Sequence, residues 1–132
     1  MTTTFNSQAD KFIRNMITAT LPMITVVSGE CRYNFRCQMN AVNDAVNSGD
    51  ERIAMCFYIE NDQPILHFVN VSKKGVYMDN TFGVWSQRVD FYLVRFIDKS
   101  SFWDVNKIFT AYRKELRRKL PLWIRILSNN SF

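Results

Sequence analysis

Apolar residues recur at helical spacing in three stretches of the chain. Residues 7–20 and 31–48 each carry apolar positions at intervals of three and four, a pattern typical of an amphipathic helix. Residues 100–119 repeat this pattern, and residues 101–104 (SFWD) fit a capping signature at the start of a helix. Pro121 then ends this third helix. The pattern therefore predicts two helices near the N-terminus and one near the C-terminus.

Between the second and third helices, the apolar pattern changes to short segments that are typical of β-strands. Turn-forming residues separate these segments at hairpin length, which favours antiparallel neighbours. The predicted strands are residues 52–59, 64–71, 76–79 and 90–97. The order of elements predicts a single α+β domain over residues 1–132, with helices packed on a four-stranded antiparallel sheet. Residues 23–27 form a short β-branched run, and residues 122–127 an apolar tail.

Composition narrows the class of protein. The chain has 132 residues, of which 47% are hydrophobic and 22% charged, as in ordinary globular domains. No apolar run approaches the ~18 residues of a membrane span, and residues 1–12 lack the order of a signal peptide. These features predict a soluble, cytoplasmic domain.

The cysteines indicate neither a disulfide framework nor a zinc site. The chain has three cysteines and one histidine, so a zinc ion would need all four of them as ligands. The paired C-x2-C spacing of zinc sites is missing, and no nucleotide-binding or zincin motif occurs. We therefore expect no metal and no cofactor. Cys56 lies inside an apolar strand, where core packing is the expected role.

The positive charge of the chain is concentrated at its C-terminal end. Residues 1–104 carry ten Lys or Arg against eleven Asp or Glu, whereas residues 105–132 carry seven basic residues against Glu115 alone. The basic residues Arg113, Lys114, Arg117 and Arg118 lie on the third predicted helix. Such a face is usually solvated, but it also fits an acidic protein, a nucleic acid or an anionic membrane surface as partner.

Three residues of the predicted core region form a candidate catalytic set. Cys37 lies on the second predicted helix, His67 on the second strand and Asp79 at the end of the third strand. A thiolate nucleophile needs an electropositive setting and a nearby base. A helix N-terminus supplies the first, a histidine the second, and a carboxylate orients the imidazole. The order of these residues predicts a Cys-His-Asp triad.

This arrangement resembles the papain-like and transglutaminase-like cysteine enzymes. Three motifs carry the resemblance over residues 31–97: a cysteine with a small residue four positions later (CQMNA, 37–41), a His-aromatic pair (67–68) and an Asp-x-Thr strand end (79–81). The pattern is also similar to small phage proteins with Cys, His-x-x-Asn and Asp-x-Thr motifs. The resemblance implies a papain-like core, and a location in the host cytoplasm if a phage encodes the protein.

Cys31 is an alternative nucleophile. It follows the Ser28-Gly29 break, a natural place for a helix to begin. Its neighbour four residues later is the bulky Phe35, whereas Cys37 has Ala41, which permits closer packing against a sheet. This comparison favours Cys37 and leaves Cys31 open.

Four further residues are candidates for an oxyanion or substrate site: Asn34, Asn40, Asn70 and Trp85. Taken singly, each of these and each triad residue also fits an ordinary structural role. A free cysteine is often a small buried hydrophobe, and an Asp before Asn-Thr is often part of a turn. The order of the three triad residues together favours the catalytic interpretation.

We therefore expect a thiol-dependent hydrolase or acyltransferase: an amidase, protease, deamidase or transglutaminase-like enzyme acting on a peptide or other amide. The alternative is a non-enzymatic phage/host interaction protein. In that case the basic C-terminal helix would bind an acidic partner or nucleic acid.

Overall fold

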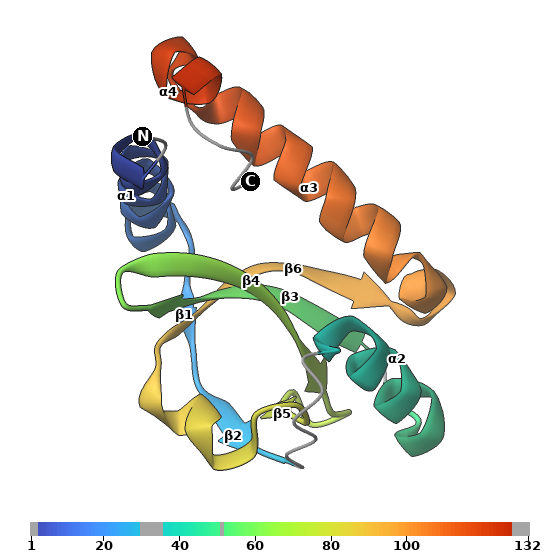
Figure 1. Ribbon diagram of the computed structural model, residues 1–132. Coiled ribbons are helices and arrows are strands. Elements are labelled where there is room, and N and C mark those ends of the chain that lie inside the picture. Colours follow the sequence, from blue (N-terminus) through green and yellow to red (C-terminus); the bar gives the residue numbers. More distant parts are fainter. Residues whose placement is uncertain (1–2, 30–35, 51, 128–132) are drawn as a thin grey trace.

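The computed structural model describes residues 3–29, 36–50 and 52–127 (Figure 1). Four α-helices, six strands and two 3-10 helices lie in the part of the chain that it describes. In chain order they are α1 (Thr3–Thr20), β1 (Met23–Ile24), β2 (Val26–Ser28), α2 (Cys37–Ser48), β3 (Arg52–Glu60), β4 (Gln63–Val71), β5 (Tyr77–Asp79), η1 (Gly83–Arg88), β6 (Phe91–Asp98), η2 (Lys99–Asp104), α3 (Val105–Lys119) and α4 (Leu122–Leu127).

The six strands form one mixed sheet in the order β1-β6-β3-β4-β5-β2. Every pair is antiparallel except β2 and β5, which run parallel. Only Thr25 separates β1 from β2, yet β1 forms one edge of the sheet, beside β6, and β2 forms the other, beside β5. The segment 23–28 thereby joins the two edges, and the sheet curls into a nearly closed barrel (Figure 1).

The prediction of a four-stranded antiparallel sheet is wrong, although the α+β class is confirmed. The two additional strands have only two and three residues. Such lengths are too short to show the alternation of apolar and polar residues that marks a strand. Their pairing is also nonlocal, because Val26 lies beside Tyr77 and Met23 beside Tyr92. A hairpin rule based on neighbouring segments cannot detect it.

The predicted hairpin between β3 and β4 is confirmed. The two strands pair from Arg52 opposite Val71 to Glu60 opposite Gln63, which leaves a two-residue turn. Asn61 and Asp62 both have positive φ angles, 50° and 64°. These are the angles of a type I′ turn, whose twist matches that of the flanking strands.

The helices differ from the predictions mainly at their ends. α1 begins at Thr3, earlier than expected, and the tail at residues 122–127 is itself helical. The capping prediction for residues 101–104 is wrong, because this stretch belongs to a 3-10 turn and the Asp104 side chain makes no capping hydrogen bond. The α-helix proper begins at Val105. The first residues of the predicted second helix, 31–35, lie outside the described part of the chain.

Alternate residues of β3 point to opposite faces of the sheet. One face packs against the helices in two outer clusters, and the other fills the barrel as an inner cluster. The first outer cluster joins α2 and the start of α3 to the sheet: Ala41, Val42, Ala45, Ile53, Met55, Phe68, Ile97, Phe102 and Val105. The second joins α1, α3 and α4: Ala9, Ile13, Ile17, Phe57, Tyr92, Leu116, Leu120 and Ile124. The inner cluster contains Val26, Ala54, Cys56, Tyr58, Val69, Val71 and Phe91.

Candidate active site

The three residues of the predicted triad come from adjacent elements. Cys37 is the first residue of α2, His67 lies in the middle of β4, and Asp79 is the last residue of β5. β4 and β5 are paired neighbours in the sheet. α2 lies against β4, because its residue Ala41 belongs to the same cluster as Phe68. The fold therefore brings the N-terminus of one helix and two strands to one place.

His67 and Asp79 form a buried pair. The Nε2 atom of His67 lies 3.0 Å from Oδ2 of Asp79, and the residues are 1% and 0% exposed. The other carboxylate oxygen of Asp79 accepts the backbone N–H groups of Thr81 at 2.7 Å and Phe82 at 3.1 Å. These bonds fix the carboxylate, which in turn orients the imidazole. Nδ1 is the ring nitrogen left for another partner.

The protonation of this pair follows from its contacts. Burial lowers the pKa of His67, but the hydrogen bond with Asp79, followed by the hydrogen bond and charge of Cys37, raises it to about 9. Burial likewise raises the pKa of Asp79, yet the hydrogen bond and charge of His67 and the two backbone N–H groups lower it below its ordinary value. At neutral pH the pair is therefore an imidazolium beside a carboxylate.

Aromatic side chains enclose the imidazole. The ring of Phe82 stacks on it with centroids 4.7 Å apart and an interplanar angle of 14°. Tyr58 meets its edge at 5.5 Å and 84°. Burial, with smaller contributions from nearby negative groups, raises the pKa of Tyr58 to about 12, so the phenol stays neutral. Neither aromatic residue was predicted from the sequence as part of the site; Phe82 directly follows the Asp-x-Thr motif, but Tyr58 carries no signal of its own.

Cys37 occupies the N-terminal end of α2. Its side chain is partly buried, its Sγ donates to Oε1 of Gln38 at 3.1 Å, and it also interacts with the imidazole of His67. The first N–H groups of an α-helix have no partner within the helix, and the helix dipole makes this end electropositive. Both properties are typical of the setting in which a cysteine acts as a nucleophile.

Cys56 has a structural environment instead. It lies opposite His67 on β3, is fully buried, and its Sγ donates to the backbone carbonyl of His67 at 3.5 Å. Burial, followed by the negative charges of Cys37 and Asp79, raises its pKa well above the ordinary value. This thiol stays protonated, and core packing is the role that its surroundings support.

Asn40 connects the cysteine helix to the carboxylate. Its Nδ2 donates to Oγ1 of Thr81 at 3.0 Å, and the backbone N–H of Thr81 donates to Asp79. Asn40 lies three residues after Cys37, close to one helical turn. The contacts of Asn40 thus position α2 relative to β5. In the sequence Thr81 is visible only as part of the Asp-x-Thr motif, and its link to α2 was not predicted.

Asn70 makes a second connection between the sheet and α2. Its Nδ2 donates to the backbone carbonyl of Ala41 at 2.8 Å, and its Oδ1 accepts from Nδ2 of Asn80 at 3.2 Å. Gly29 approaches the same region, because its N–H donates to the carbonyl of Asp79 at 2.8 Å. These contacts tie β2, β5 and α2 together around the triad residues.

The structure leaves three of the candidates without a described side chain. Cys31 and Asn34 lie outside the described residues, and Trp85 belongs to η1 but its side chain is not described. Among the residues that the structure does describe, no group of three or more His, Cys, Asp or Glu side chains could hold a metal ion. Within the same residues, no helix has the length and apolar character needed to cross a membrane.

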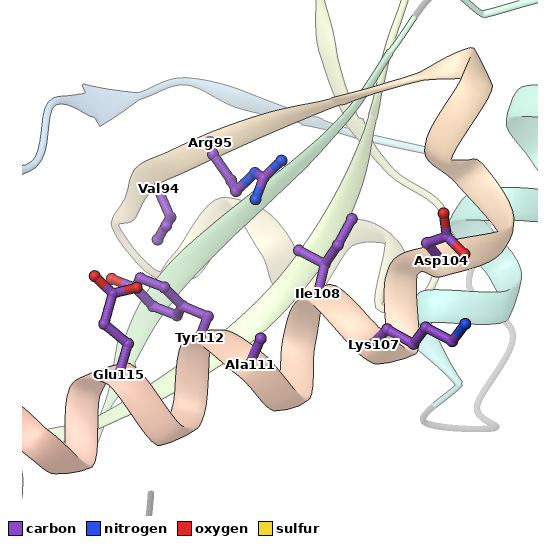
Figure 2. A pocket seen from close by; sticks show the side chains of 8 residues that line it. All are labelled: Val94, Arg95, Asp104, Lys107, Ile108, Ala111, Tyr112 and Glu115. Atoms are coloured by element: carbon purple, nitrogen blue, oxygen red, sulfur yellow. The ribbon is translucent and has the colours of Figure 1, made fainter.

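A separate cavity of about 550 Å³ lies between β6 and α3 (Figure 2). Two basic residues, Arg95 and Lys107, and two acidic residues, Asp104 and Glu115, line this cavity. None of the three triad residues lines it. Its remaining lining residues are Val94, Ile108, Ala111 and Tyr112. Tyr112 points from the helix toward the sheet and Glu115 lies beside it (Figure 2).

No protein-family model, curated protein or solved structure matches the chain. The resemblance to papain-like and transglutaminase-like enzymes therefore remains a prediction from sequence motifs. The geometry of Cys37, His67 and Asp79 is the evidence that bears on function.

Proposed function

We propose that the protein is a thiol-dependent hydrolase or acyltransferase that acts on an amide or related acyl bond. Cys37 is the nucleophile, His67 is the general base and then the general acid, and Asp79 orients His67. The observation that carries the proposal is the buried His67–Asp79 pair at 3.0 Å, whose imidazole also interacts with a cysteine at a helix N-terminus. A thiol, an imidazole and a carboxylate in this relation match the requirements for an activated nucleophile.

In the proposed reaction the proton of Cys37 has already passed to Nδ1 of His67, which is the imidazolium, and the Cys37 sulfur attacks the carbonyl carbon of the substrate as a thiolate. The tetrahedral intermediate collapses as the carbon–nitrogen bond breaks, and His67 returns the proton to the departing amine. The product is a thioester on Cys37. Water or a second amine then attacks this thioester and gives its proton to His67, and Cys37 leaves as the thiolate, so that the imidazolium is restored.

The negative oxygen of the tetrahedral intermediate needs hydrogen-bond donors. The backbone N–H of Cys37 lies in the first turn of α2, where such groups have no partner within the helix. We assign this N–H to the oxyanion site. Asn40 and Asn70 are positioning residues in this proposal, because Nδ2 of each already donates to a protein group.

Alkylation with iodoacetamide near neutral pH, followed by mass mapping of the adduct, tests this assignment. Cys37 should react faster than a normal thiol, because its thiolate is favoured by the helix end and by imidazolium formation. The His67→Ala variant should slow the reaction at Cys37. Cys56 is an internal control within the same molecule, since burial and its raised pKa should keep it unreactive until the protein unfolds.

The same experiment decides between the two cysteines left open by the sequence. A fast adduct on Cys31 with an unreactive Cys37 would move the nucleophile to Cys31. Equal and slow labelling of all three cysteines would contradict the enzyme proposal. It would favour the second candidate function, a non-enzymatic interaction protein that binds an acidic partner or nucleic acid through Arg113, Lys114, Arg117 and Arg118.

Two contacts of α3 bear on that second candidate. The Arg113 guanidinium lies 5.4 Å from the ring centre of Phe109, and Arg117 donates to a backbone carbonyl of α4. Lys114 and Arg118 are exposed on the same helix. An acidic partner would therefore meet Lys114 and Arg118 first, and neutralising both should weaken its binding and reduce the salt dependence of that binding.

A further inference from the structure

α4 presents three large apolar side chains to solvent. Leu122, Trp123 and Ile126 are 62%, 53% and 68% exposed. At 100° per residue these positions fall within about a third of the helix circumference, and Ile124 falls on the opposite side. The three side chains therefore form one exposed apolar face, which we call the α4 face.

The α4 face is held rigidly by the rest of the fold. Ile124 is buried in the second outer cluster, beside residues of α1 and α3. Nη2 of Arg117 donates to the backbone carbonyl of Arg125 at 2.7 Å, which holds the last turn of α4 against α3. Figure 1 places α4 at the end of the molecule away from β2 and β5. The face is thus fixed at one end of the protein.

Positive charge surrounds the α4 face in the sequence. Arg118 and Lys119 precede it and are exposed, and Arg125 lies within α4 beside Leu122 on the helical wheel. The only acidic residue of the stretch, Glu115, lies 3.9 Å from Lys119. Arg118 and Arg125 therefore have no acidic residue of their own in this stretch.

The two arginines at the junction of α3 and α4 also retain unused hydrogen-bond donors. Nη1 of Arg117 and Nε of Arg125 are buried and have no hydrogen-bond partner in the described part of the chain. The Arg117 guanidinium and the backbone of Arg125 are in direct contact. Both side chains add positive charge to this end of the protein, and that charge attracts an anionic surface.

We propose that the α4 face docks on the surface of a membrane that contains anionic phospholipid. Leu122, Trp123 and Ile126 enter the boundary between headgroups and acyl chains, and the surrounding cations meet the lipid phosphates. Apolar insertion combined with a basic rim is the pattern of helices that lie in the membrane interface. A nucleic acid accounts for the cations and for Trp123, but it offers no apolar surface to Leu122 and Ile126. The aliphatic residues therefore favour lipid.

Flotation of the full-length protein with vesicles tests the proposal. One vesicle preparation contains phosphatidylcholine alone, and the other contains phosphatidylcholine mixed with phosphatidylserine. We expect the protein to float with the anionic vesicles and to be released by salt. The triple variant L122S/W123S/I126S should reduce the partition by at least about tenfold, because it removes the inserted apolar surface.

A second variant tests the charges without changing the apolar face. R118Q/R125Q should weaken the partition by about fivefold for each cation removed. Trp103→Ser is the matched control for the apolar change, since Trp103 is 69% exposed on η2 outside α4. Lys73→Gln with Lys74→Gln, in the β4–β5 turn, is the matched control for charge. Neither control should alter binding.

Three results would overturn the proposal. They are absence of flotation with anionic vesicles at low salt, equal flotation with neutral vesicles, and binding to DNA or RNA under conditions where vesicles are ignored. A Cys37→Ser variant should float like the wild type, because docking does not depend on the thiol. Failure of the proposed catalytic function and failure of this proposal are therefore distinguishable.

Discussion

Replacing Asp79 with Asn should lower the pKa of His67 from about 9 toward or below its ordinary value of 6.5. The hydrogen bond with Asp79 is the largest contribution that raises the pKa of His67, and only burial, which lowers it, is larger. An Asn at this position keeps an oxygen that can accept the N–H groups of Thr81 and Phe82. The change therefore removes the charge and leaves the local hydrogen bonds of the turn in place.

The size of the effect follows from the contacts. A pKa of about 9 against 6.5 corresponds to about 3 kcal/mol of free energy that favours the imidazolium in the folded protein. The hydrogen bond and charge of Cys37 supply part of this free energy. In the double variant C37S/D79N, burial should therefore be the main contribution to the pKa of His67. In that variant the pKa of His67 should fall below 6.5, because a buried imidazole is favoured in its neutral form.

NMR of the imidazole nitrogens measures this pKa directly. His67 is the only histidine of the chain, so its titration needs no assignment among several histidines. The spectra should be recorded from pH 5 to pH 10 for the wild type, D79N and C37S/D79N. A wild-type imidazole that titrates near 6.5, or a double variant that still titrates near 9, would refute the reasoning.

The same shift predicts how stability depends on pH. Because the pKa of His67 is raised in the folded protein, its contribution to the free energy of unfolding is complete below pH 6.5 and is lost as pH rises through about 9. The pKa of Asp79 is lowered from 3.8, so its contribution is present above pH 3.8 and is lost at more acidic pH. For D79N, the free energy of unfolding measured in urea should show neither of these two dependences on pH.

Three further changes test other contacts. Gly29→Ala would place a methyl group against the Asn80 side chain, and we expect unfolding in urea to become about 1–3 kcal/mol easier. Thr81→Val removes the acceptor of Asn40 and should cost about 1–3 kcal/mol in the same assay and slow alkylation of Cys37, whereas Thr81→Ser should restore both. Deletion of residues 102–132 removes part of both outer clusters, so circular dichroism should show no cooperative melting; a sharp transition would contradict this.

The parts of the fold that could be predicted from the sequence are those specified by neighbouring residues. The β3–β4 hairpin follows from two apolar segments and a turn of Asn61 and Asp62, and α3 follows from its apolar stripe. The closure of the sheet could not be predicted in this way. β2 has three residues, and its parallel partner β5 lies far along the chain. Pairing of this kind depends on the tertiary structure and leaves no local periodicity.

The candidate site likewise contains features that could be predicted from the sequence and features that could not. The order of Cys37, His67 and Asp79 along one helix and two strands could be predicted from the sequence, and the structure places these three residues together. The stacking of Phe82 on the imidazole and the hydrogen bond from Asn40 to Thr81 could not be predicted from the sequence. Both join residues from separate elements, and each residue alone has an ordinary sequence context. Contacts of this kind emerge only once the chain is folded.

The segment that joins the two edges of the sheet has a consequence for the order in which the chain gains structure. His67 belongs to a hairpin closed by a two-residue turn, a contact that costs little chain entropy. Asp79 lies on β5, which pairs with the hairpin strand β4 on one side and with β2 on the other, and the pairing of Val26 with Tyr77 encloses a long loop. Local opening of β2 would remove one of the two strands that hold β5 and leave the hairpin intact. Amide hydrogen exchange should therefore be faster at residues 26–28 than in β3.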